Sequence, residues 1–526
     1  MKTSTDATQE IERKYDATSD AESLPPLNDV EGVIQVEERT EILDATYYDT
    51  PDLQLSTHGI TLRRRTGGSD AGWHLKLPSG PDAREEIRAP LTDETAVPGT
   101  LASLVRARTR DQSLLPVVRI VNVRDVRRLL DAEGRALAEV SYDNVTAHPI
   151  DPSTPEVAAS MEWSEAEVEL IEGSPPFLDT VEHHLTAAGM QRSRSASKLA
   201  RALGNRLPAR PSAQPTRPTH TPHGTKKRKT KRPSAADVVL GYLSEHTARI
   251  TDLDIAVRRD QPDAVHQMRV SARRLRSALK TFRTVLDRKV TEPLADELKW
   301  LGAKLGVDRD REVLTARLYE RIDELPESLI VGPVPTRVGS WSDAQRTENR
   351  SGLMNVLNGP RYLALLRALD ALLAQPPLLP GSDKPATATL PKDVLRDWQR
   401  LANRIQPTRT TPPGPERDLQ LHNARKAAKR TRYAAEAVQP ALGKPAKKFR
   451  IQMKALQKLL GEHQDSVVAR NTLRDLATQA TLAGESSFTY GLLHHVEHDR
   501  ADDAERQLPA AWHTASRPKL RKCLAR

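Results

Sequence analysis

The chain has 526 residues, a single cysteine (Cys523) and a formal net charge of +10. One thiol cannot form a disulfide framework within the chain, and the sequence has neither an apolar signal segment nor a run of about 18 uncharged apolar residues. These features exclude the disulfide-rich secreted and membrane-spanning classes. We expect a soluble, cytoplasmic protein of two domains, each large enough for its own core.

Charge is divided unequally along the chain. Residues 1–204 hold 22 Lys and Arg against 35 Asp and Glu, whereas the remaining residues hold 58 against 35. The pattern indicates an acidic, metal-using domain joined to a domain that binds a polyanion. Nucleic acid, anionic lipid and polyphosphate all qualify as that polyanion.

The boundary between the two halves is the segment 205–234, which is rich in Pro and Thr and poor in hydrophobic residues. Such a composition is typical of a disordered linker. The run KKRKTKR at 226–232 has two interpretations. It is either a nuclear localisation or nucleic-acid patch, or a solvated tether that adds non-specific affinity for anions.

Short segments of alternating character predict strands in the first half. In EIERKYD (10–16), Glu10, Glu12 and Lys14 share one face of a strand, while Ile11 and Tyr15 lie on the other. The same alternation appears in five further segments: GITLRRR (59–65), GWHLKLP (72–78), REEIRAPL (84–91), LAEVSYDNV (137–145) and WSEAEVEL (163–170).

Charges of one sign are grouped on single strand faces. Glu165, Glu167 and Glu169 share a face, as do Arg63 and Arg65. Such grouping is unfavourable unless opposite charge lies between the groups, so we predict a closed antiparallel barrel with a charged interior. Clustered carboxylates suit Mg²⁺ or Mn²⁺, and Arg and Lys suit phosphate oxygens. A metal-bridged phosphate chain fits both sets.

These motifs resemble the CYTH family of triphosphate tunnel metalloenzymes over residues 5–204. The resemblance is carried by ExExK (10–14), TYYDTPDLQLSTHGITLRRR (46–65), WHLKLP, AEVSYDNV and EVEL. It implies an eight-stranded tunnel that binds a triphosphate group with Mg²⁺ or Mn²⁺. Members of the family hydrolyse inorganic triphosphate, thiamine triphosphate or RNA 5′-triphosphates, and some cyclise ATP.

The resemblance also implies roles for individual residues. The predicted metal-binding and catalytic acids are Glu10, Glu12, Glu167, Glu169 and Asp143; the triphosphate-binding bases are Lys14, Arg63, Arg65, Lys76, Arg124, Arg119 and Lys198; Glu86 and Glu139 are further tunnel acids. In VVRIVNVRDVRRL (117–129), Arg124 is the first candidate and Arg119 the second. Val121 and Val123 stand there where the family pattern has polar or basic residues, which puts one phosphate subsite in doubt.

The second half contains an internal duplication of helical sequence. VHQMRVSARRLR (265–276) aligns with LHNARKAAKRTR (421–432), and KWLGAKLGVDRD (299–310) aligns with LQKLLGEHQD (456–465), so that Asp310 corresponds to Asp465. In each copy, one histidine and three basic residues recur at helical spacing and share one face. They are His266, Arg269, Arg273, Arg276, His422, Arg425, Lys429 and Arg432.

These motifs resemble the CHAD family, the conserved histidine α-helical domain, over residues 235–526. The resemblance implies two four-helix subdomains, about 235–373 and 390–526, around a basic channel that binds inorganic polyphosphate through the eight residues just named. The whole chain has 4 Phe, 6 Trp and 9 Tyr, which leaves little for base stacking, so nucleic acid is the weaker candidate.

The sequence therefore predicts a multidomain α+β protein with an N-terminal antiparallel eight-stranded β-tunnel and a C-terminal all-α domain of duplicated four-helix bundles. The predicted function is a Mg²⁺- or Mn²⁺-dependent triphosphatase whose C-terminal domain holds polyphosphate and would locate it at polyphosphate granules. Two alternatives remain open: an adenylate cyclase on the same fold, and a polyphosphate-binding protein without catalysis.

Overall fold

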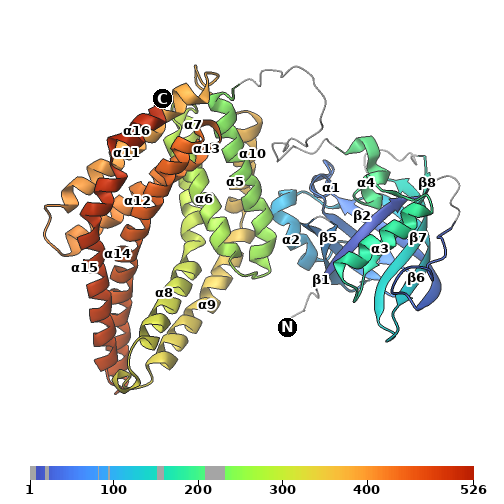
Figure 1. Ribbon diagram of the computed structural model, residues 1–526, viewed down its shortest axis with the longest axis horizontal. Coiled ribbons are helices and arrows are strands. Elements are labelled where there is room, and N and C mark those ends of the chain that lie inside the picture. Colours follow the sequence, from blue (N-terminus) through green and yellow to red (C-terminus); the bar gives the residue numbers. More distant parts are fainter. Residues whose placement is uncertain are drawn as a thin grey trace. The chain divides into compact units, whose positions relative to one another are not determined.

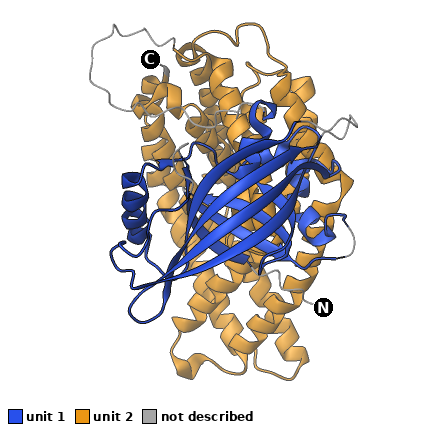
Figure 2. Ribbon diagram, turned by 90° about the vertical axis from the view of Figure 1, so that its right-hand side faces the viewer, with its two compact units in different colours: residues 1–217 blue, residues 218–526 orange. Residues whose placement is uncertain are grey.

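The computed structural model describes residues 7–17, 23–80, 82–92, 95–150, 159–207 and 232–525 (Figure 1). The chain divides into two compact units, residues 1–217 and 218–526, which Figure 2 colours separately. Most of the predicted linker, including residues 226–231 of the basic run, lies outside the described residues. In the part of the chain that the structure describes, no helix has the length and apolar character needed to cross a membrane.

Eight strands of the first unit close into an antiparallel barrel. Their order is β5-β4-β3-β2-β6-β7-β8-β1, and β1 pairs with β5 to complete the circle. This confirms the predicted eight-stranded tunnel. The strands are β1 (Ala7–Asp16), β2 (Gln35–Asp49), β3 (Thr61–Thr66), β4 (Gly72–Gly80), β5 (Ala83–Ala89), β6 (Leu115–Leu130), β7 (Ala136–Pro149) and β8 (Met161–Leu170), with β9 (Gln191–Arg192) paired to β1.

Helix α3 (Pro175–Ala187) covers an apolar part of the barrel's outer surface. Tyr15 of β1 and Val168 of β8 are buried in one core with Val181 of this helix. Because successive strand residues point to opposite sides, the burial of Tyr15 beneath α3 turns Glu12 and Lys14 into the barrel. The alternation seen in the sequence therefore separates an apolar exterior from a charged interior.

Helix α4 (Lys198–Leu203) closes one end of the barrel. Leu199 and Leu203 pack in a core with inward-facing apolar residues of β6 and β7, including Ile120 and Ala147. This packing directs Lys198 toward the charged interior. The remaining short helices of the unit are α1 (Gln54–Thr57), α2 (Gly99–Thr109) and the 3₁₀ turn η1 (Gly204–Arg206).

The second unit is built from two helical repeats. The first contains α5 (Ala235–Arg258), α6 (Ala264–Thr281), α7 (Arg288–Lys304), α8 (Gly306–Asp323), the 3₁₀ turn η2 (Glu327–Leu329), α9 (Val334–Asn358) and α10 (Pro360–Ala374). The second contains α11 (Ala386–Thr408), α12 (Pro415–Ala437), α13 (Gln439–Leu442), α14 (Lys444–Leu482), α15 (Phe488–Ala515) and α16 (Pro518–Ala525). A single residue separates α7 from α8, and another separates α9 from α10. In the second repeat, α14 corresponds to the first of these pairs and α15 to the second, and both are continuous. Each repeat therefore has four long helical segments.

The arm formed by α8 and α9 meets the arm formed by α14 and α15 at its far end (Figure 1). There Leu318 and Val338 of the first repeat share a buried core with Leu473 and Leu493 of the second. The repeats also contact each other through α6 and α12. These contacts hold the two basic helices of the duplication next to each other.

Arg317 of α8 joins the two arms through an ion-pair network. Its guanidinium donates to Glu497 of α15 at 2.6 and 2.8 Å and to Glu462 of α14 at 2.7 Å, and Glu497 is fully buried. Arg317→Ala would leave the Glu497 carboxylate with Arg321 alone, at 3.3 Å. We expect the free energy of unfolding to fall by about 3 kcal/mol, because a buried charge loses its main partner.

Urea denaturation followed by helical circular dichroism measures this loss. Arg346→Ala is the matched control, because the Arg346–Asp260 pair at 3.5 Å is exposed on both sides and its removal should cost less than about 1 kcal/mol. Equal destabilisation by the two variants would contradict the role of Arg317 in joining the arms.

Candidate active site and cationic cavity

Inward-facing side chains of the barrel and of α4 line a cavity of about 100 Å³, the tunnel cavity. Strand register brings the charges together: on β1 and β8, Glu12 lies opposite Glu169 and Lys14 opposite Glu167. The structure gathers most of the predicted tunnel residues on this lining: Glu10, Glu12, Lys14, Arg63, Arg65, Lys76, Glu86, Arg124, Glu167, Glu169 and Lys198.

Three carboxylates at the α4 end of the tunnel cavity hold the ammonium of Lys198. Its Nζ lies 2.7 Å from Asp143, 2.9 Å from Glu165 and 2.6 Å from Glu167. Burial opposes a charged lysine, but these carboxylates raise the pKa of Lys198 above its ordinary value. Asp143 also accepts two hydrogen bonds from Arg124, at 2.7 and 2.8 Å.

Asp143 and Glu167, predicted as metal-binding and catalytic acids, both lie among cations in the structure. The three acids near Lys198 are spaced like a metal ligand set, yet an ammonium already lies among their oxygens. Asp143 is fully buried and lies behind the cavity lining. Asp143 and Glu167 pair with Lys198 and Arg124 here, and their predicted part in metal binding stays a prediction.

A second group of carboxylates, Glu10, Glu12 and Glu169, has less positive charge around it. Burial, followed by repulsion from Glu10 and Glu12, raises the pKa of Glu169 to about 7. Within the described residues, Glu169 forms no ion pair. A divalent cation would relieve this repulsion, and ligand sets made only of oxygen suit Mg²⁺ or Mn²⁺. These three carboxylates therefore fit the predicted metal.

Guanidinium groups crowd the opposite part of the lining. Burial, followed by repulsion from Arg63 and Arg124, lowers the pKa of Arg65 to about 9. Asp70 forms an ion pair with Arg65 but does not offset the three charges. Clustered guanidiniums offer paired N–H donors that match the geometry of phosphate oxygens.

Cations and carboxylates meet directly across the tunnel cavity. Lys76 lies 2.5 Å from Glu10, and Glu12 lies 3.3 Å from Lys14 and 3.1 Å from Arg84. A volume of about 100 Å³ holds only a few water molecules. A triphosphate would therefore enter by replacing carboxylates as the partner of these long, flexible cations.

Six lining residues were absent from the predicted site: Tyr47, Thr61, Asp70, Arg84, Arg88 and Ser197. Arg84 shares the charged face of its strand with Glu86, so the alternation carried a signal for it. The Tyr47 hydroxyl accepts a hydrogen bond from Arg63 at 3.4 Å, and Asp70 lies in the turn between β3 and β4. Neither Tyr47 nor Asp70 has a sequence signal of its own, because each reaches the cavity through barrel closure or a turn.

The structure does not place Arg119 in the tunnel cavity. Side chains of β6 alternate, and Arg124 points inward, so Arg119 points outward and is half exposed, where it pairs with Asp44. Val121 and Val123 share that outward face. Val121 and Val123, which depart from the family pattern, therefore lie on the exterior, and Arg124 is the arginine of this strand that lines the tunnel cavity.

Glu139, predicted as a tunnel acid, also lies off the cavity lining. It faces Glu169 across the β7–β8 pair, but its carboxylate turns to Arg39, at 3.0 and 3.2 Å. Its partner lies on β2, so Glu139 contributes to pairing between strands.

In the helical unit, the basic faces of α6 and α12 line a cavity of about 1300 Å³, the cationic cavity. Arg309 and Arg317 of α8 and Lys299 of α7 add further positive charge. The structure brings all the predicted polyphosphate-binding residues onto this lining: His266, Arg269, Arg273, Arg276, His422, Arg425, Lys429 and Arg432.

Each repeat orients one arginine of the cationic cavity in the same way. Arg269 donates two hydrogen bonds to Asp310, at 2.6 and 2.9 Å, and Arg425 pairs with Asp465 at 3.3 Å. The guanidinium of Arg269 lies against Gly306, where an added Cβ would come within 2.8 Å of it. Asp310 and Asp465, which correspond in the sequence duplication, thus each position one arginine of the cationic cavity.

Charge crowding in the cationic cavity is strong at Lys429. Burial, followed by repulsion from Arg425, Arg273 and Arg269, lowers the pKa of Lys429 to about 7, and Asp465 offsets this only in part. An incoming polyanion would favour the charged ammonium.

The two duplicated histidines are also held toward their neutral form. Burial, followed by nearby Arg309 or Lys426 among other charges, lowers the pKa of His266 and of His422. Within the described residues, Nδ1 of each ring is buried without a hydrogen-bond partner. As neutral rings, both histidines can offer one N–H donor each to a bound polyanion.

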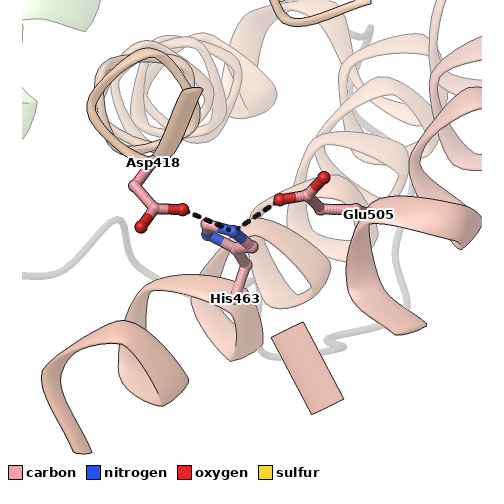
Figure 3. Close-up of side chains that lie close together, drawn as sticks. All are labelled: Asp418, His463 and Glu505. Atoms are coloured by element: carbon pink, nitrogen blue, oxygen red, sulfur yellow. Dashed lines mark hydrogen bonds and ion pairs between the residues drawn. The ribbon is translucent and has the colours of Figure 1, made fainter. Parts of the chain in front are cut away.

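A further titratable cluster lies in the second repeat (Figure 3). Nε2 of His463 on α14 is 3.0 Å from Glu505 of α15 and 3.3 Å from Asp418 of α12, a spacing that a metal ligand set could have. Arg417 pairs with Glu505 at 2.9 Å and Arg470 with Asp418 at 3.6 Å. Both carboxylates are thus balanced by arginine, which favours an ion-pair network that joins three helices.

Comparisons with known proteins agree with this architecture. A CYTH domain matches residues 8–203 and a CHAD domain matches residues 241–474. The chain is 39% identical over 517 residues to uncharacterized proteins of two Mycobacterium tuberculosis strains, with 95% of each chain covered.

Several solved structures resemble one unit or the other. PptA from Streptomyces chartreusis has 22% identity and a TM-score of 0.46, over 53% of this chain and 100% of that chain. The CHAD domain of Ricinus communis has 28% identity and a TM-score of 0.43, over 56% and 97%. HpAC1 from Hippeastrum, a candidate adenylyl cyclase with a dominant triphosphatase activity, has 18% identity and a TM-score of 0.24, over 38% and 96%.

The CYTH match lies in the first unit of the structure and the CHAD match in the second. The relatives align with nearly the whole chain. The chain belongs to the family of proteins in which a CYTH domain is followed by a CHAD domain.

Proposed function

We propose that the first unit is a Mg²⁺- or Mn²⁺-dependent triphosphatase that hydrolyses inorganic triphosphate or a related triphosphate. CYTH domains are in general those of triphosphate tunnel enzymes, either triphosphatases or cyclases. One observation carries the proposal. In one enclosed cavity, carboxylates with too little counter-charge lie opposite closely spaced guanidiniums. A phosphate chain and a divalent cation together would neutralise both sets.

Different residues would bind the phosphate chain, bind the metal and hold α4. Arg63, Arg65 and Arg124 would hold phosphate oxygens in fixed orientation by paired N–H donation. Lys14 and Lys76 would leave their carboxylate partners to bind the phosphate chain. Glu10, Glu12 and Glu169 would hold the metal, which when bound offsets phosphate charge and supplies a Lewis acid. Lys198 keeps α4 in place at the closed end.

The lining of the tunnel cavity favours hydrolysis of an inorganic chain over cyclisation of a nucleotide. Among its described residues, Tyr47 is the aromatic side chain, and its hydroxyl is engaged with Arg63. A nucleotide base would need an apolar or aromatic surface to stack on. We therefore place adenylate cyclase behind triphosphatase as a candidate activity.

We further propose that the second unit binds inorganic polyphosphate in the cationic cavity. CHAD domains are associated with polyphosphate binding. The duplicated guanidiniums converge from two helices, and Tyr433 is the aromatic side chain among the described lining residues, so the target is a phosphate backbone more than a base. Such binding would hold the enzyme at polyphosphate granules or supply its substrate.

A substrate panel tests the catalytic proposal. Purified protein is incubated with inorganic triphosphate, ATP or thiamine triphosphate and with Mg²⁺ or Mn²⁺, and released phosphate and cyclic AMP are measured. Phosphate release from inorganic triphosphate supports the proposal. Cyclic AMP as the main product would establish the cyclase, and turnover of none of them would establish a binding protein.

Glu169→Gln should lower the rate of triphosphate hydrolysis by about a hundredfold, because the metal would lose a charged ligand. The measurement is phosphate release as a function of metal concentration. Glu139→Gln is the matched control: it is the same change at the residue opposite Glu169 on β7, outside the tunnel cavity. An unchanged rate in Glu169→Gln would remove this carboxylate from the metal site.

Polyphosphate affinity should depend on pH through Lys429. The free ammonium has a pKa of about 7, and a bound polyanion raises it, so binding takes up a proton and affinity falls as pH rises above about 7, by up to tenfold per pH unit. The charged groups that face Lys429 are Arg425, Arg273 and Arg269, with Asp465 as the carboxylate that partly offsets them. Isothermal titration with polyphosphate at several pH values gives the slope.

Lys429→Arg is the control for this pH dependence. Its guanidinium keeps the positive charge at all pH values used, so affinity above about pH 7 should become independent of pH. A wild-type affinity that is flat across this range would contradict the assignment, as would a slope that survives in Lys429→Arg.

A further inference from the structure

A second anion-binding surface lies on the outer side of α11. It is a groove of about 630 Å³ between α11 and α12, the outer groove. Its lining is Arg396, Gln399, Arg400, Asn403, Arg404, Pro407, Gln420 and Asn423. Among these described residues are three guanidiniums and four carboxamides, and no carboxylate.

Guanidinium and carboxamide groups supply N–H donors that suit phosphate oxygens. The nearest acids lie beneath the groove: Asp393 and Asp397 are buried, and they pair with Arg396 at 2.6 Å and with Arg400 at 3.8 Å. Nη2 of Arg396 also donates to the Thr281 carbonyl at 2.6 Å, whereas within the described residues Arg400 has only the longer pair with Asp397. Because the lining has no aromatic side chain, it offers a base nothing to stack on.

The outer groove is continuous with the cationic cavity. Arg400, Arg404 and Asn423 line both. Arg400 also lines a smaller cavity of about 190 Å³ with Arg283, Lys280 and other residues. In that cavity, repulsion from Arg396, followed by burial and Arg400, lowers the pKa of Arg283. Basic residues thus link the cationic cavity to the outer groove and the smaller cavity, whose lining also contains Glu292 beside Arg288.

This extension breaks the symmetry of the duplication. Helix α11 carries four basic residues against two acids. Helix α5, at the corresponding place in the first repeat, carries two basic residues against four acids. The charge extends on one side only, so the two ends of the cationic cavity differ.

We propose that a polyphosphate chain bound in the cationic cavity continues into the outer groove, which is a subsite for long chains and makes affinity depend on chain length. The proposal rests on polyphosphate binding by the second unit. A chain too short to leave the cationic cavity gains nothing from the groove. A longer chain adds charge-assisted contacts and releases further counterions.

The test places negative charge in the outer groove without touching the cationic cavity. Gln399→Glu with Asn403→Asp replaces two exposed carboxamides by carboxylates of the same shape. Gln479→Glu with Gln507→Glu adds the same two negative charges at exposed positions of α14 and α15 and is the charge-matched control. Binding of tripolyphosphate, long-chain polyphosphate and single-stranded RNA to the full chain is measured at several salt concentrations without divalent metal. The tripolyphosphate that still binds an Arg269→Glu, Arg425→Glu variant is assigned to the tunnel cavity and subtracted.

The groove variant should lose about tenfold or more in affinity for long-chain polyphosphate and show a shallower salt dependence. Its affinity for tripolyphosphate should stay at the wild-type value, and the control variant should match wild type with both. Unchanged affinity for the long chain would overturn the subsite, as would equal losses for long and short chains.

Two other outcomes separate the related proposals. RNA that competes as well as long-chain polyphosphate of equal charge would overturn the assignment to an inorganic chain. Wild-type protein that binds neither phosphate chain would reject polyphosphate binding itself, and with it the subsite, whereas a wild type that binds both equally well rejects the subsite alone.

Discussion

Both units hold like charges close together and away from bulk water, and the repulsion between these charges constrains both structures. In the barrel, strand alternation and closure force carboxylates and guanidiniums into one enclosed space. In the helical unit, duplication brings two basic helix faces against each other. Neither arrangement is favourable unless counter-charge lies nearby, and each unit supplies only part of it. The proposed phosphate ligands would supply the remainder.

The two units offset this repulsion only in part, and they do so in different ways. The tunnel cavity places cations and anions across from each other, so a ligand must exchange with internal ion pairs such as Lys76–Glu10. The cationic cavity has few acids, and Asp310 and Asp465 orient arginines without cancelling the field. The first arrangement suits a small substrate bound with a cation, and the second suits a long polyanion held by its backbone.

Much of the barrel interior was predictable because strand alternation has a period of two. Once Glu12 and Lys14 are assigned to one face, closure alone sends that face inward. The strand that contains Arg119 and Arg124 shows the limit of this reasoning. Its charged residues occupy both odd and even positions, so the inward face depends on register with β2 and β7, which no local pattern reveals.

Contacts between distant segments account for the other differences. The role of Asp143 depends on where α4 seats Lys198, and the sequence of neither segment encodes that contact. The duplication was visible because the same basic positions recur at helical spacing. The outer groove was not, because half of its lining is made of carboxamides that no charge pattern detects and that only packing of α11 on α12 brings together.

The seating of α4 also bears on how the first unit forms during synthesis. Lys198 lies 31 residues after Glu167, so the acids that it neutralises are translated before their partner. Until the last helix of the unit leaves the ribosome, Asp143, Glu165 and Glu167 lack one of their cations, and one end of the sheet is uncovered. The barrel should therefore reach its final packing as a late, concerted event rather than strand by strand, and a chain arrested before residue 198 should remain open and prone to associate with other chains.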